Sequence, residues 1–286
     1  MDVYLAYASR GANAWWRYLL CLALACLLAA IMVMAIVVVL MLTHLLPDDL
    51  AVQVQHPESV IPFFAGVGAS FGILTIGLAI AMARVHGKRP GDVVGQWRWS
   101  YFAWGFGVWF TVQTALALID FLIAPHGFAL SAGGGTLPLA AVAFAGILIQ
   151  TFSEEFIFRG YMTQGLLLLL KNPLPTAIVS GVLFGSLHIA NGIPQALNAT
   201  VFGIVCALIA IRTGGIALSF GLHLANNYFG AVVVVSASDV FKGSPGIVTQ
   251  TTPQLLWWDV FLGVAVLIAV PWLIFRQRYF SAAPTS

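Results

Sequence analysis

The sequence has little charge. Only 8% of its 286 residues are Asp, Glu, Lys or Arg, whereas 60% are hydrophobic; soluble domains average roughly a quarter charged residues. The chain therefore has too few charged side chains to cover a globule in water, which excludes an ordinary soluble domain. The composition instead favours an all-α integral membrane protein, since each membrane-spanning helix needs about 20 mostly apolar residues. We expect a lipid bilayer around it, and specifically the plasma membrane, crossed several times.

Other absences narrow the possible functions. The chain has only three cysteines, all in apolar runs, so no disulfide framework is expected. Its 12 Lys and Arg residues form no basic block, which argues against nucleic acid as a partner. The sequence contains no HExxH motif and no internal repeat. These patterns predict a single membrane domain over residues 1–286 without a required cofactor, and no oligomeric state follows from them.

Long apolar runs, by contrast, are numerous. Short segments such as "HGKRPGD" and "KNPLP" separate them with the Pro, Gly and charge that interrupt helices. The pattern predicts a bundle of about eight transmembrane helices, at residues 18–46, 60–83, 99–124, 137–170, 173–190, 195–211, 214–236 and 255–275.

Lys and Arg are distributed unevenly between the two sides of such a bundle. With Arg159 set aside as intramembrane, ten fall on the side of both termini and only Lys242 falls on the other. Cytoplasmic loops carry the excess of Lys and Arg in membrane proteins. Both termini are therefore predicted to be cytoplasmic. Histidines in the connections, His86 among them, are expected to be solvated.

One apolar run contains a cluster of charges. The segment "TFSEEFIFRG" puts Glu154, Glu155 and Arg159 in the fourth predicted span, where ionisable side chains are costly and usually face a polar cavity. Glu155 and Arg159 are four residues apart, so they can pair on one helix face. Glu154 is turned about 100° away from Glu155. It is left as a free carboxylate.

Further polar residues are expected at the depth of Glu154. Glu154 and His188 each lie 17 residues from Lys171, so antiparallel helices would place both about 25 Å from that turn. His223 and Asn227 share one face of the seventh predicted span. A carboxylate with an imidazole can activate water, and a second imidazole with an amide can stabilise an oxyanion. Together these groups predict hydrolysis of an amide bond.

The same residues resemble the motifs of a known family. "EEFIFRG" matches the Glu-Glu-x-x-x-Arg motif of the CAAX prenyl endopeptidase and bacteriocin-processing (CPBP) family of intramembrane proteases. "FGSLH" matches its Phe-x-x-x-His motif and "HLANN" its His-x-x-x-Asn motif, in the family's order. The resemblance covers residues 137–236, about a third of the chain.

The resemblance implies an eight-helix endopeptidase that cleaves a membrane-associated or lipidated peptide or protein. It implies that Glu154 is the base that activates water and that His188 helps to hold this water. It further implies that His223 and Asn227 stabilise the oxyanion. The motif residues left in supporting positions are Glu155, Arg159 and Phe184.

Two other functions fit the same polar cluster. A zinc-dependent protease would use Glu154, His188 and His223 as a ligand set with one open water position. A non-enzymatic membrane protein would use the cluster to bind or transport a solute.

The predicted orientation can be tested by labelling single cysteines in a variant whose three native cysteines are replaced. A cysteine at either end of the chain should react with a membrane-impermeant maleimide only after permeabilisation, because both ends are predicted to be cytoplasmic. A cysteine at Asp48, in the acidic first connection, should react in intact cells and is the matched control. Labelling of either end in intact cells would contradict the prediction.

Overall fold

The structure is a computed structural model that describes residues 2–45, 47–133, 136–251, 264–265 and 268–269. The eighth predicted span, 255–275, lies largely outside these described residues.

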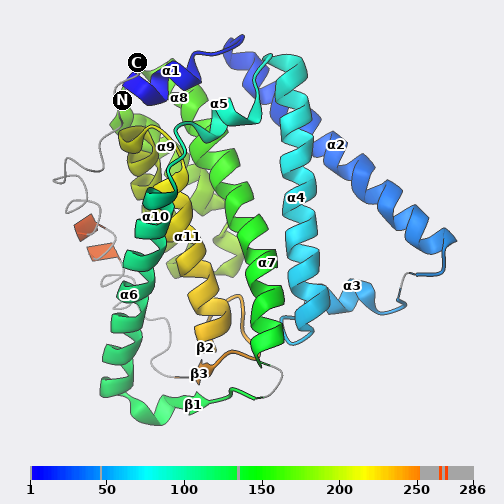
Figure 1. Cartoon of the computed structure of the whole chain (residues 1–286), viewed down its shortest axis with the longest axis vertical. Helices are drawn as coiled ribbons and strands as arrows, with labels where there is room; N and C mark the ends of the chain where they lie inside the picture. The colour runs from blue at the N-terminus through cyan, green and yellow to red at the C-terminus, as the bar shows by residue number, and fades with distance from the viewer. Residues whose placement is uncertain (1, 46, 134–135, 252–263, 266–267, 270–286) are drawn as a thin grey trace.

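Five helices of the described part are long and apolar enough to cross a membrane. Each corresponds to one of the predicted apolar runs, and together they form the mostly helical bundle of Figure 1. A multi-pass membrane protein follows from their length and composition. Their bounds are Trp15–Leu42 (α2), Val60–Val85 (α4), Trp99–Ile123 (α6), Ala140–Leu170 (most of α7, together with η2 and α8) and Ile193–Thr213 (α10).

Two shorter helices complete the part of the bundle that carries the polar motifs. They are α9 (Pro173–Ser186) and α11 (Ala217–Tyr228). The side chain of Asn172 caps α9 by accepting the backbone N–H of Leu174 at 3.1 Å, and Pro173 occupies the first helical position, where its missing N–H costs nothing. The helix α10 ends at Thr213 and is followed by Gly214 with φ of +82°, a conformation that favours glycine.

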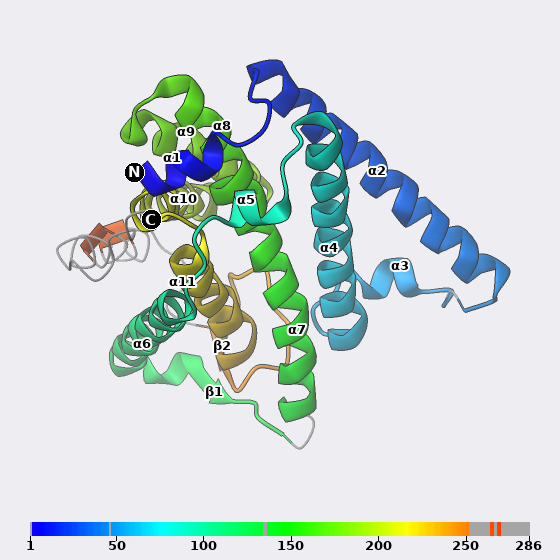
Figure 2. The ribbon, with the colours of Figure 1, turned by 45° about the horizontal axis from the view of Figure 1, so that its top comes forward.

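Views from two directions show α7 (Thr136–Glu154) between α4 and α11, with α6 packed along α11 and α2 on the outer side of α4 (Figures 1 and 2). The helices α1 (Asp2–Ala8), α5 (Pro90–Val94) and α8 (Thr163–Leu170) lie at one end of the bundle. A short helix, α3 (Leu50–Gln53), precedes α4. The end of the bundle that holds α1 is called the α1 end, and the opposite end is called the sheet end.

A small sheet lies at the end opposite α1, which the all-α prediction did not include. Strand β3 (Val248–Gln250) pairs antiparallel with β1 (Phe128–Leu130) and parallel with β2 (Val234–Ser236). The predicted seventh span is therefore too long, because after α11 the chain forms a π-helix, η4 (Phe229–Val233), and then β2. The run of valines here favours an extended strand over a helix.

The expectation that His86 is solvated is wrong. His86 is only 2% exposed. Its Nε2 lies 2.8 Å from the Tyr161 hydroxyl, and its Nδ1 contacts the Ala12 carbonyl. Beside it, Lys88 donates from Nζ to the Ala8 carbonyl at 2.7 Å, and burial lowers the pKa of this amine to about 8. The N-terminal segment therefore folds over the α4–α5 connection. The apolar pattern of the sequence did not predict this contact.

Small residues lie where the long helices cross, as in other membrane bundles. Gly105 on α6 faces α11, and a Cβ at this position would overlap the carbonyl oxygen of Leu218. Gly221 on α11 faces back, and a Cβ there would overlap the carbonyl oxygen of Phe102. This close approach holds α11, which carries a polar motif, against α6.

Gly105→Ala should therefore destabilise the bundle by about 1–3 kcal/mol, the usual cost of forcing an extra carbon into a packed interface. Thermal unfolding in detergent should show a Tm lowered by several degrees. Gly107→Ala on the same helix is the matched control, because a Cβ there meets nothing within 4 Å. Equal Tm values for the two variants would show that the α6–α11 contact is not tight.

Candidate active site

The charged motif lies on a π-helix in the middle of the bundle. Helix α7 ends at Glu154 and continues without a break as the π-helix η2 (Glu155–Met162), which leads into α8. The wider winding is stabilised where Thr163 Oγ1 donates to the carbonyl of Phe158, five residues earlier, at 2.7 Å. Single π-turns inside α-helices occur often at functional sites.

The guanidinium of Arg159 is fully enclosed by protein. Its Nη1 lies 3.3 Å from Glu155 Oε1, and both side chains are 0% exposed. The ring of Phe184 covers the guanidinium, with 4.1 Å between the Arg159 Cζ and the ring centroid. Glu155 thus supplies the neutralising charge, as the spacing predicts, and Phe184 supplies a favourable aromatic face. This gives Phe184 a physical role that its position in a motif alone does not reveal.

Both glutamates contact the same imidazole. His223 Nδ1 lies 2.9 Å from Glu155 Oε1, and its Nε2 lies 3.4 Å from Glu154 Oε2. A carboxylate only accepts hydrogen bonds, so Nδ1 carries a proton that it donates to Glu155. The sequence predicts His223 near Glu154, His188 and Asn227. Its bond to Glu155 was missed because it joins residues 68 positions apart on different helices.

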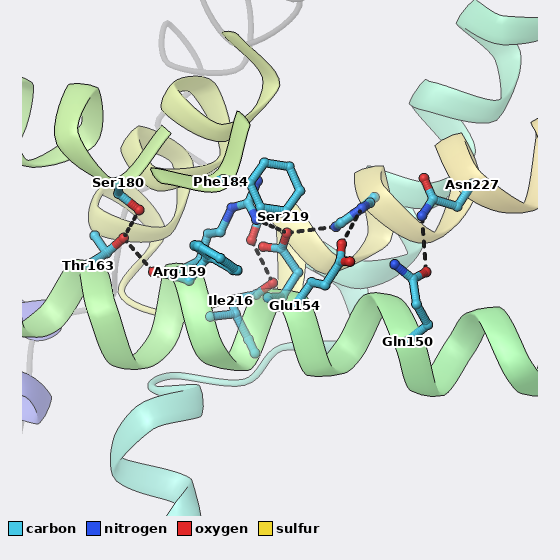
Figure 3. A network of polar contacts seen from close by, with 12 residues as sticks. Gln150, Glu154, Arg159, Thr163, Ser180, Phe184, Ile216, Ser219 and Asn227 are labelled. Carbon is cyan, nitrogen blue, oxygen red and sulfur yellow. Dashed lines mark hydrogen bonds and ion pairs between the residues drawn. The ribbon is translucent and has the colours of Figure 1, made fainter. Parts of the chain in front are cut away.

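Glu154 differs from Glu155 in its surroundings. It is 8% exposed, lines a cavity of about 560 Å³, and its buried Oε2 receives no hydrogen bond from the described residues. His188, His223 and Asn227 line the same cavity, as does Phe184. Figure 3 shows Glu154 projecting from its helix beside the contact of Asn227 with Gln150. The structure thus brings the predicted polar residues of three helical segments together around one cavity.

His188 lies just outside a helix. The predicted fifth span continued to residue 190, but α9 ends at Ser186 and His188 precedes the short 3₁₀ helix η3 (Ile189–Asn191). His188 Nδ1 lies 3.0 Å from the carbonyl oxygen of Phe184. A carbonyl only accepts, so Nδ1 donates and the neutral imidazole presents the lone pair of Nε2. His188 can therefore accept a hydrogen bond from a water.

Asn227 belongs to a chain of side-chain hydrogen bonds. Trp109 Nε1 donates to Asn226 Oδ1, Asn226 Nδ2 donates to Asn227 Oδ1, and Asn227 Nδ2 donates to Gln150 Oε1, each at 3.1 Å. This chain holds the Asn227 amide in one orientation. Sequence reasoning missed its other members, although Gln150 precedes Glu154 by four residues and therefore shares its helix face.

The segment that carries these residues is similar to a known family. Residues 136–229 match the family model described as type II CAAX prenyl endopeptidase Rce1-like. The resemblance to the CPBP family is confirmed. The chain is also 34% identical over 193 residues to the "uncharacterized protein YyaK" of Bacillus subtilis (strain 168). This alignment covers 63% of the chain and 64% of that relative. No solved structure gives a significant match.

A zinc-type site is not formed by the CPBP motif residues in this arrangement. Across the described ranges, no three His, Cys, Asp or Glu side chains are grouped so that they could hold a metal ion. The grouping of Glu154, His188 and His223 that the zinc hypothesis requires is thus not found among the described residues.

Glu155→Gln should destabilise the protein strongly, because it leaves Arg159 buried without a neutralising charge. Breaking a buried pair costs about 3–5 kcal/mol, so Tm in detergent should fall markedly. Glu154→Gln is the matched control one residue away. Its side chain lies at the cavity and compensates no guanidinium, so Tm should change little. Similar losses in both variants would contradict this division of roles.

Proposed function

We propose that the protein is an intramembrane endopeptidase in which Glu154 is the base that activates water. The observation that carries the proposal is the contrast between two adjacent carboxylates. Glu155 neutralises a buried guanidinium, whereas Glu154 faces a cavity next to two imidazoles and an amide. The family match over residues 136–229 supports peptidase chemistry. The proposed substrate is a membrane-associated or lipidated peptide or protein.

In the proposed reaction, Glu154 removes a proton from a water whose other hydrogen is donated to His188 Nε2. The water oxygen attacks the carbonyl carbon of the peptide bond, forming a C–O bond and an oxyanion. When the tetrahedral intermediate collapses, the C–N bond breaks and Glu154 returns its proton to the departing nitrogen. No further reactant is needed, because water and the peptide supply every atom of the two products.

The oxyanion requires N–H donors. Asn227 has a second Nδ2 hydrogen besides the one donated to Gln150. His223 can donate from Nε2 only when both of its ring nitrogens are protonated, since Nδ1–H is directed at Glu155.

Eight spans with both termini in the cytoplasm complete the proposal, in the plasma membrane. The support is the position of the Lys and Arg residues at the α1 end, near the N-terminal segment, the α4–α5 connection and the α8–α9 turn. Lys242 follows β2 at the sheet end. On this orientation the sheet end faces away from the cytoplasm.

Glu154→Gln should lower the rate of peptide cleavage by about a hundredfold or more, the usual scale for loss of a general base. The measurement is kcat/KM on an internally quenched peptide library with purified protein in detergent. Glu58→Gln, an exposed carboxylate in the first connection, is the control and should retain full activity. Normal cleavage by Glu154→Gln would refute the assigned role.

The same preparation separates the competing functions. A zinc protease would lose activity in strong chelator and would contain about one metal per chain by elemental analysis, whereas the proposed reaction should continue in chelator. A non-enzymatic binding or transport protein would cleave no peptide, and a folded Glu154→Gln variant would then differ from the wild type in binding alone.

A further inference from the structure

The candidate cavity is larger than the polar cluster, and it extends along α11 to the sheet end. Beyond His223 and Asn227 it is lined by Gly230 of η4 and by side chains of β2, the loop that follows it, and β3. The polar residues of this outer part include Asp120, Asn198, Ser236, Ser238, Asp239 and Gln250. A substrate that reaches Glu154 from the sheet end passes these groups first.

The described residues give this outer part negative charge. Among the described residues that line the cavity, the carboxylates are Asp120, Glu154 and Asp239, and none is Lys or Arg. The cavity is therefore matched to a peptide segment that brings positive charge with it.

Asp239 is the carboxylate best placed to meet that charge. Its Oδ2 lies over Gly230, 3.3 Å from the position that a Cβ of this residue would occupy, and its Oδ1 accepts the backbone N–H of Phe241 at 3.3 Å. Burial raises the pKa of Asp239, and the groups that lower it are the backbone N–H groups of Phe241 and Val240. A carboxylate held by neutral donors in a partly desolvated place is stabilised by an incoming guanidinium or ammonium.

The spacing along the helix sets the distance between this carboxylate and the reacting bond. Gly230 follows His223 by seven residues, about 10 Å at a helical rise of 1.5 Å per residue. An extended peptide covers this length in about three residues. A basic side chain within about three residues of the reacting bond therefore reaches Asp239 while that bond lies beside Glu154.

Two acceptor atoms without a hydrogen-bond partner also belong to residues of the cavity. The buried Oε2 of Glu154 receives no hydrogen bond, and neither does the buried Oδ1 of Asn198, among the described residues. Both residues line the cavity. At the mouth, Asp120 accepts a hydrogen bond from Gln250 Nε2 at 3.3 Å, which ties this carboxylate to β3.

We infer that the cavity selects a peptide segment with a Lys or Arg side chain within about three residues of the cleaved bond, entering from the sheet end. Asp239 is the specificity-determining residue. The inference rests on the proposed function, because it names the substrate class of the same site.

The test compares peptides that differ only in charge. Internally quenched peptides containing one arginine are paired with the same peptides containing citrulline, which has nearly the same shape without the charge. Wild-type protein should cleave the arginine peptides with a kcat/KM at least about tenfold higher, the scale of a partly buried charge pair. Asp239→Asn should bring this ratio close to one. Asp48→Asn, an exposed acid outside the cavity, should preserve it.

Binding separates failure of recognition from failure of catalysis. The Glu154→Gln protein and the Glu154→Gln/Asp239→Asn protein are titrated with the same labelled peptides, with Tm measured for each. Preferential binding of arginine peptides that disappears in the double variant supports the proposed recognition. If the wild type cleaves none of these peptides, the proposed proteolysis is overturned but the recognition is not. Equal affinity for arginine and citrulline peptides, or a preference that survives Asp239→Asn, would overturn the recognition.

Discussion

A guanidinium enclosed among apolar helices must be neutralised where it lies, and this constraint organises the site. Arg159 and Glu155 are both 0% exposed, so neither charge can be solvated by water. Their attraction alone seldom offsets the loss of hydration. The structure adds the aromatic face of Phe184 above Arg159 and the Nδ1–H of His223 on Glu155. In this way one ion pair on η2 fixes a residue of α9 and a residue of α11.

The same constraint separates the two glutamates. Because Glu155 neutralises Arg159, its neighbour Glu154 is left to face the cavity from the adjoining turn of the helix. The π-helix begins at the boundary between them. His223 contacts both carboxylates, so it links the neutralised pair to the cavity residue. This arrangement supplies a free carboxylate, an acceptor nitrogen on His188 and two potential N–H donors, which are the groups that the proposed hydrolysis needs.

The two ends of the bundle also differ in the charged residues that they contain. At the α1 end, buried Lys88 and His86 are held by backbone carbonyls and a tyrosine, and the N-terminal segment covers them. At the sheet end, the cavity is bordered by Asp120 and Asp239 instead. The two ends thus differ in their charged groups: Lys88 and His86 are buried under the N-terminal segment at one end, and carboxylates line the cavity at the other.

The sequence by itself determined the class of protein, the positions of five long helices and the polar residues of the candidate site. Those signals are local: apolar length, residue spacing within one helix, and the i, i+4 relation of Glu155 and Arg159. Tertiary structure alone decided the rest. Four features each join segments far apart in the chain: the bond from His223 to Glu155, the hydrogen-bond chain to Gln150, the burial of His86 and the β-sheet. The periodicity of one helix does not indicate which distant segment it will contact. The π-helix belongs with them: Gly160 within it lies so close to Val93 of a distant segment that a Cβ would overlap it.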